Sequence, residues 1–220
     1  MPPVYHQRGF RLPAGATEVV LVRHGASEAA VPGRPFPMLD GHGDPALSPE
    51  GEAQALAVAE RLSAEPPAAL FVTPLRRTSM TAAPLVERTG LQPVVVHDLR
   101  EVSLGEWEGG EFRIRMAEGD PVAVQAVAEE RWDVIPGAER MEAFAQRVRS
   151  GIEAILAAVG PDVSVAAVVH GGVIGEVCRQ ATSSRPFAFV HADNGSLTRL
   201  VVAPGGPWLL RSFNDTAHLA

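Results

Sequence analysis

Apolar runs of strand length alternate with helical segments along most of this chain, and this alternation limits the fold more than any other feature of the sequence. Strands are predicted at residues 17–25, 68–73, 92–98 and 163–172, and two final strands at 195–203 and 208–214 indicate a hairpin. Helices are predicted from Ser48 onward and at residues 74–90, 138–159 and 173–182. Strands that alternate with helices indicate a mainly parallel sheet covered on both faces.

The expected architecture is therefore a three-layer α/β/α sandwich with a mainly parallel central sheet. We expect residues 1–16 to form an N-terminal leader, poorly ordered or packed on the surface, and residues 17–220 to form a single domain. Residues 31–51 are rich in proline and glycine and predict no regular structure before the helix that Ser48 caps. Residues 99–137 break the alternation with short helical pieces and turns, which predicts a small insertion over one end of the sheet.

The charged residues and the single cysteine exclude several classes of function. The formal net charge is −7 and basic runs are absent, so no nucleic-acid partner is expected. No apolar run is long enough to cross a membrane and no secretory signal is recognisable, so a cytoplasmic protein without a membrane partner is expected. Cys178 alone cannot form an intrachain disulfide or a cysteine-based zinc site.

All 19 basic residues are arginine, so any anion site must be built from arginine, histidine and backbone N–H groups. Two buried strands end alike, at His24 and at His170, and each histidine is followed by glycine. Because ligands of such sheets bind beyond the carboxyl ends of the strands, we expect both imidazoles to face one crevice. Arg23 adjoins the first histidine, and Arg76 and Arg77 follow the second strand. Imidazoles and guanidiniums around one point predict a site for a phosphoryl dianion.

Glu101 follows the third strand, at the same predicted edge of the sheet, where it could act as a general acid and base. Each of these residues alone has an ordinary structural role as its alternative: a strand-end histidine can be packed, adjacent arginines can lie on a solvated helix face, and a glutamate can lie on the surface. The repeated strand–histidine–glycine pattern favours the catalytic interpretation.

Five segments, in this order, resemble motifs of the histidine phosphatase superfamily, also called the phosphoglycerate mutase-like family. They are "LVRHGASE" (21–28), "LSPEGEAQA" (47–55), "TPLRRTSMTA" (73–82), "LREVSLGEWEG" (99–109) and "VVHGG" (168–172). The resemblance runs from about residue 17 to 219 and implies the same α/β/α fold, with the insertion at 99–137 over the active site.

The resemblance also implies the chemistry and its residues. His24 would be the nucleophile that takes the phosphoryl group, and Glu101 would protonate the leaving oxygen and then activate water. The residues implied to bind phosphate are Arg23, Ser27, Arg77, His170 and Gly171. No metal and no cofactor are expected, the substrate would be a small phosphorylated metabolite, and the protein could form a homodimer.

Two positions depart from the family pattern, because Ala26 and Ala30 stand where members often carry polar residues. The loop at 31–45 is also longer than in many small members, and this loop and the 99–137 insertion are where specificity should lie. The roles of His42 and His191 stay open between lining the mouth of the site and an ordinary loop role. A cofactor-dependent phosphoglycerate mutase and a non-catalytic relative that binds phosphorylated ligands remain the alternatives to a phosphatase.

Overall fold

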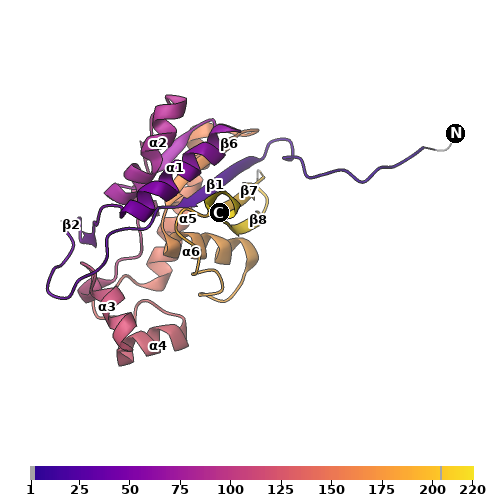
Figure 1. Ribbon diagram of the computed structural model, residues 1–220. Coiled ribbons are helices and arrows are strands. Elements are labelled where there is room, and N and C mark those ends of the chain that lie inside the picture. Colours follow the sequence, from indigo (N-terminus) through magenta and orange to yellow (C-terminus); the bar gives the residue numbers. More distant parts are fainter. Residues whose placement is uncertain (1–2, 204) are drawn as a thin grey trace.

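A six-stranded sheet forms the centre of the molecule (Figure 1). The structure is a computed structural model and describes residues 3–203 and 205–220. In spatial order the strands are β5 (Val94–Val95), β4 (Leu70–Val72), β6 (Ser164–Val169), β1 (Thr17–Arg23), β7 (Leu197–Val202) and β8 (Trp208–Asp215). The first four run parallel, and β7 is antiparallel to both of its neighbours, so the predicted hairpin closes one edge.

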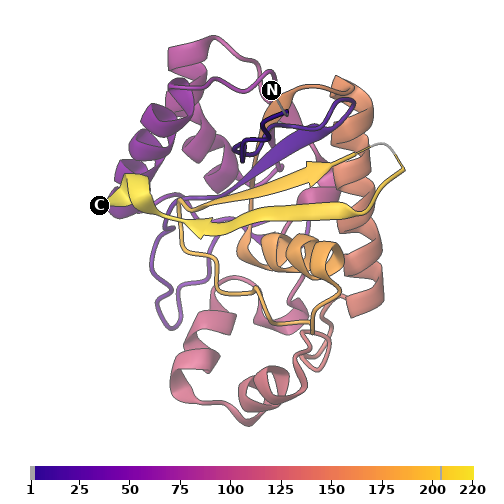
Figure 2. The ribbon, with the colours of Figure 1, turned by 90° about the vertical axis from the view of Figure 1, so that its right-hand side faces the viewer.

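Helices cover both faces of the sheet, which confirms the predicted three-layer architecture (Figure 2). Helices α1 (Pro49–Ser63) and α2 (Arg76–Thr89) pack on one face. Helices α5 (Met141–Val159) and α6 (Gly171–Thr182) pack on the other.

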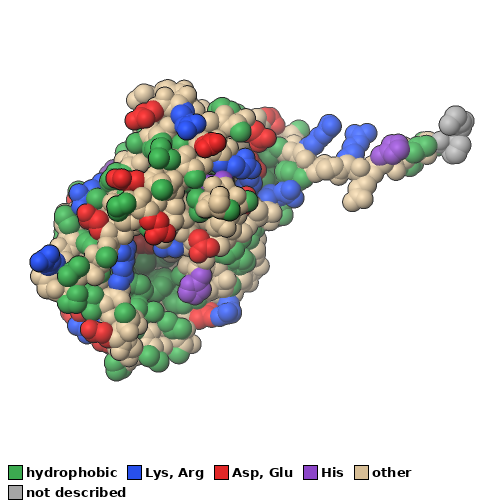
Figure 3. Space-filling model, viewed as in Figure 1, with side chains coloured by type: hydrophobic (Ala, Val, Ile, Leu, Met, Phe, Trp, Pro, Cys, Tyr) green, Lys and Arg blue, Asp and Glu red, His purple; other side chains and the backbone are tan. Residues whose placement is uncertain are grey.

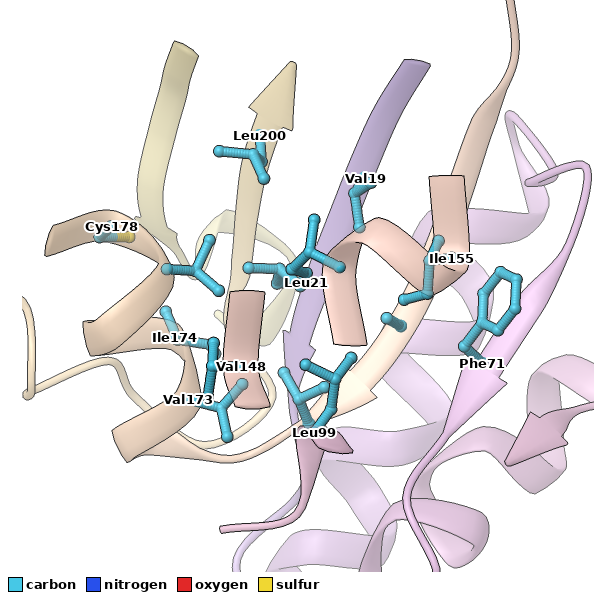
Figure 4. Close-up of a cluster of buried hydrophobic side chains, with 14 of the residues drawn as sticks. Val19, Leu21, Phe71, Leu99, Val148, Ile155, Val173, Ile174, Cys178 and Leu200 are labelled. Carbon is cyan, nitrogen blue, oxygen red and sulfur yellow. The ribbon is translucent and has the colours of Figure 1, made fainter. Parts of the chain in front are cut away.

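The alternation of side chains along β1 separates the two cores. Val19 and Leu21 belong to the core under α5 and α6, drawn in Figure 4, whereas Val20 and Val22 belong to the core under α1 and α2. Successive side chains of a strand point to opposite faces, so an unbroken apolar run is what a strand covered on both sides requires.

Local sequence signals set several helix ends as predicted. The Ser48 hydroxyl accepts a hydrogen bond from the Gly51 N–H at 3.2 Å, and Pro49 opens α1. Helix α2 ends at Gly90, whose φ of 73° lies in the left-handed region that favours glycine.

Two expectations were wrong in detail. The predicted strand at 92–98 is only the two residues of β5, because the chain turns into the 3₁₀ helix η1 (His97–Leu99) directly after it. The loop 31–51 is not wholly irregular, since β2 (Met38–Leu39) pairs with β3 (His42–Gly43). Asp40 and Gly41, both at positive φ, form the two-residue turn between them, and an Asp-Gly pair is a known hairpin signal.

The insertion at 99–137 forms a small cap beside the main body, seen below the sheet in Figures 1 and 2. It contains the 3₁₀ helix η2 (Gly105–Trp107) and the helices α3 (Glu111–Glu118) and α4 (Pro121–Glu129), around a core of Trp107, Ala123 and Ile135.

Both ends of the described part of the chain lie at the surface. Residues 3–13 have no regular secondary structure and extend away from the body, and the 3₁₀ helix η3 (Ala217–Leu219) lies near the other end (Figure 1). Among the described residues, no helix is both long enough and apolar enough to cross a bilayer.

Candidate active site

Two histidines from distant parts of the chain meet at one edge of the sheet. Strands β1 and β6 are parallel neighbours in which Arg23 lies opposite Val169, so the next residues, His24 and His170, leave the sheet side by side. Their ring centroids are 5.2 Å apart, with an interplanar angle of 63°. The two imidazoles therefore meet as expected, but only His24 lines the cavity described below, whereas His170 is fully buried beside it.

The hydrogen bonds of His24 fix which ring nitrogen carries the proton. Its Nδ1 lies 2.7 Å from the Gly25 carbonyl oxygen, which can only accept, so Nδ1 carries the hydrogen. Nε2 therefore holds the lone pair, and it accepts a hydrogen bond from Nε of Arg77 at 3.2 Å. The nitrogen that faces the arginines is thus the one able to act as a nucleophile.

Burial keeps both imidazoles neutral. The pKa of His24 lies well below its usual value because burial disfavours the charged ring, and the positive charge of Arg77 adds to this effect. Burial, followed by Arg77 and then His24, lowers the pKa of His170 in the same direction. Both rings are therefore in the neutral form at neutral pH, which nucleophilic attack by His24 requires.

Two guanidiniums border the histidines, and both remain charged because arginine does not deprotonate in proteins. Arg23 donates to the Ala192 carbonyl, and its buried Nε has no hydrogen-bond partner among the described residues. Arg77, at the N-terminal end of α2, donates from Nη1 to the Gly43 carbonyl at 2.9 Å. Arg76 instead is exposed and donates to the Asp44 carbonyl, so Arg77 is the one of the pair in the cavity, as expected.

The Glu101 carboxylate lies over the start of α6. Its two oxygens accept from the backbone N–H groups of Val102, at 2.9 Å, and Gly172, at 3.1 Å. A Cβ on Gly172 would lie 2.4 Å from Oε1 of Glu101, so any other residue there would displace the carboxylate from this position. Its charge reaches both Arg23 and Arg77, where it opposes the lowering of their pKa by burial.

Of the remaining two predicted phosphate ligands, one lines the cavity and the other does not. Gly171 lines the cavity at the first residue of α6, next to Arg23. Ser27 is not among the lining residues, and its hydroxyl accepts a hydrogen bond from Nη2 of Arg113 at 2.7 Å.

Of the two histidines whose roles the sequence left open, only His42 lines the cavity. His42 is buried, lines the cavity, and places Nε2 at 3.1 Å from the Glu101 carbonyl oxygen. His191 is exposed and is not among the lining residues.

Sequence reasoning missed Thr73 and Arg113. The Thr73 hydroxyl, fully buried just past β4, lies 3.0 Å from Nε2 of His170 and orients that ring. Thr73 directly follows an apolar strand, as His24 does, and this position could have identified it from the sequence. Nothing in the sequence around Arg113 marks it, because its neighbours at the site lie far away along the chain.

A cavity of about 350 Å³ lies between the body and the cap, and its polar lining includes Arg23, His24, Arg77, Glu101 and Arg113. Figure 3 shows this face, with a recess between the body and the cap that has hydrophobic side chains in it. Besides the charged groups, four aromatic side chains of the loop and cap line the cavity: Phe36, Trp107, Phe112 and Trp132. Among the described residues, no cluster of three His, Cys, Asp or Glu side chains could hold a metal ion.

Comparisons with known proteins agree with this geometry. The sequence pattern of the histidine phosphatase superfamily (branch 1) matches residues 19–216. A metal-independent phosphoserine phosphatase of Arabidopsis thaliana is 31% identical over 93% of this chain and 84% of its own length. A glucosyl-3-phosphoglycerate phosphatase of Mycobacterium tuberculosis is 33% identical over 93% of this chain and 97% of its own length.

A solved structure of a related protein has the same fold. The native structure of a mycobacterial glucosyl-3-phosphoglycerate phosphatase superimposes with a TM-score of 0.75 at 30% identity, covering 91% of this chain and 100% of that one.

Proposed function

The chain belongs to the histidine phosphatase superfamily, and we propose that this phosphatase hydrolyses small phosphomonoesters through a phosphohistidine formed at His24. The observation that carries the proposal is the neutral His24, with its Nε2 lone pair directed at the group of cations that would hold the phosphate. The roles below follow from the contacts of each residue.

In the first step, Nε2 of His24 attacks phosphorus and the bond to the ester oxygen breaks. Glu101 in its protonated form gives its proton to that oxygen, so the alcohol leaves neutral. Arg77, which donates to Nε2 before substrate binds, turns its donors to the phosphoryl oxygens instead.

In the second step, water attacks the phosphorus of the phosphohistidine. Glu101, now a carboxylate, takes a proton from the water, the P–N bond breaks, and inorganic phosphate and the neutral imidazole are regenerated. The same carboxyl group serves both steps because its backbone hydrogen bonds hold it in one place beside α6.

Fixed positive charge stabilises both transition states. A metaphosphate-like transition state spreads charge over three oxygens and mainly needs positioned cations and N–H donors. Arg23, Arg77 and the N-terminal end of α6 line the cavity and would supply these groups. His170 would add a donor from Nδ1, which has no hydrogen-bond partner among the described residues, while Thr73 holds its Nε2.

The names of the relatives, phosphoserine phosphatase and glucosyl-3-phosphoglycerate phosphatase, support hydrolysis over the mutase alternative. A mutase must also keep its phosphohistidine away from water, whereas this cavity opens to solvent beside the cap.

The test is hydrolysis of 4-nitrophenyl phosphate in the presence of EDTA. We expect turnover by the wild type and a loss of at least about 1,000-fold in kcat for His24→Ala, since covalent catalysis is removed. His191→Ala, an exposed histidine outside the cavity, is the matched control and should keep wild-type kcat. Equal turnover by His24→Ala and the wild type would contradict the proposal, as would a requirement for added metal.

Two further predictions from the sequence, a cytoplasmic location and a homodimer, remain predictions because a single chain bears on neither.

A further inference from the structure

Part of the cavity lining is aromatic, and Phe36, Phe112 and Trp132 are called the aromatic wall here. Phe112 and Trp132 pack edge to face with ring centroids 5.8 Å apart, and both come from the cap, whereas Phe36 comes from the loop at 31–45. Leu104 and Val190 line the cavity too. Flat apolar surfaces of this kind favour a ligand with an apolar body, because burying apolar surface of the ligand against them is favourable.

Arg113 lies against this wall and close to the phosphate end. Its guanidinium carbon is 5.5 Å from the centre of the Phe36 ring, and the side chain lines the cavity. The charge of Arg113 helps to lower the pKa of His24, and the charge of Arg23 acts in turn on Arg113. The guanidinium therefore stands within electrostatic reach of the reacting atoms.

The positive charge of Arg113 is left unneutralised. Nη1 donates to the Glu28 carbonyl at 2.8 Å and Nη2 donates to the Ser27 hydroxyl, both neutral groups. Within residues 3–203 and 205–220, no carboxylate forms an ion pair with it.

Three nearby arginines do have such a partner, whereas Arg100, also in the 99–137 segment, forms no ion pair within the described residues. Arg115 pairs with Glu111, Arg131 with Asp133, and Arg147 with Glu139, each at 2.7 Å. An arginine has five N–H donors, so Arg113 retains three after its two hydrogen bonds. Arg113 is exposed, lies on the Phe36 ring and lines the cavity, so an anion bound there can reach its remaining donors.

We propose that Arg113 selects phosphomonoesters whose alcohol part carries its own anionic group on a flat apolar body, which lies against the aromatic wall. This inference rests on the proposed function, in that the phosphate of the ligand occupies the site at His24. Arg113 would bind the anion of the alcohol part, and Arg23 and Arg77 would bind the transferred phosphoryl group.

The test uses phosphonates, which cannot be hydrolysed, so that binding is measured apart from turnover. Isothermal titration compares 3-carboxybenzylphosphonate with 3-carbamoylbenzylphosphonate, which has the same shape without the charge, and benzylphosphonate with ethylphosphonate. Each ligand is titrated into the wild type, Arg113→Gln and Arg149→Gln. Arg149, on α5, is the matched control because it is also an exposed arginine, but it pairs with Glu153 and does not line the cavity.

We expect the wild type and Arg149→Gln to bind the carboxylate at least about tenfold more tightly than the amide, as a charge-assisted pair should. In Arg113→Gln this ratio should fall to about one, with an unchanged melting temperature. All three proteins should bind benzylphosphonate at least about tenfold more tightly than ethylphosphonate.

Two results would overturn the proposal: equal affinities for carboxylate and amide in the wild type, or a loss in Arg113→Gln that is the same for both ligands, which would place the guanidinium on the phosphonate. If benzylphosphonate binds no better than ethylphosphonate, the part of the proposal that places an apolar body on the aromatic wall is contradicted. Failure of the proposed function looks different, because the phosphonates would then bind to a protein that hydrolyses no ester.

Discussion

His24 is held as a neutral imidazole by its surroundings rather than by its own chemistry. The ring is buried, Gly25 fixes the proton on Nδ1, and Arg77 faces Nε2. The same arginine that disfavours the protonated ring also favours the dianion that the ring attacks. The contacts of His24 with Gly25 and Arg77 thus keep the nucleophile neutral and place a cation where the phosphate would bind.

Glu101 should affect turnover and leave binding nearly intact. Replacing it with glutamine removes the proton donor but keeps a similar shape over α6, so kcat for phenyl phosphate should fall by about 100- to 10,000-fold with a small change in KM. Steady-state kinetics checks this, with Glu106→Gln as the control because Glu106 is exposed in the same segment. A rise in KM at unchanged kcat would mean that Glu101 only binds substrate.

At the scale of elements, the site is assembled from the carboxyl ends of three parallel strands and the starts of the helices that follow them. Strand β1 leads to His24, β4 to Thr73 and Arg77, and β6 to His170. The starts of α2 and α6 both point partial positive charge at this edge. Parallel strand order is therefore what gathers residues almost 150 positions apart.

The glycines of the motifs also act at this scale. A Cβ on Gly51 would lie 1.9 Å from the Ala26 carbonyl oxygen, and one on Gly25 would lie 2.4 Å from the Gly51 carbonyl oxygen. The start of α1 therefore presses on the loop after His24 with only backbone atoms between them, which fixes that loop in place.

The sequence allowed prediction of features that depend on residues close together in the chain. The apolar run of β1, the cap at Ser48 and the histidine after each strand are local signals, and they gave the sheet, the helix starts and the crevice. Arg113 could not be found in this way, because its role depends on a loop 85 residues earlier in the chain. The contact of Thr73 with His170 spans 97 residues and depends in the same way on strand pairing.

At the scale of the whole molecule, burial of two imidazoles links folding to pH. The folded pKa of each ring is lowered, while the unfolded chain should titrate near the ordinary value of 6.5. Below that pH the unfolded state binds more protons than the folded state, so acid favours unfolding.

The free energy of unfolding should therefore fall as pH drops from 7 to 5.5, by up to about 1.4 kcal/mol per pH unit for each buried histidine and about 2.7 for both. Urea unfolding at a series of pH values measures this slope. His24→Asn should remove about half of it, and an identical slope in the variant and the wild type would show that His24 does not stay neutral in the fold.

The covalent intermediate tests the central claim most directly. Glu101→Gln is mixed with 2,4-dinitrophenyl phosphate, whose leaving group needs no proton, so that the phosphoenzyme forms and then hydrolyses slowly. The reaction is quenched in alkali, in which phosphohistidine survives, and the peptides are analysed by mass spectrometry. The account predicts up to about one phosphoryl group per chain, attached to His24 and lost in acid. Phosphate on another residue, or dinitrophenol release with no covalent phosphate, would contradict it.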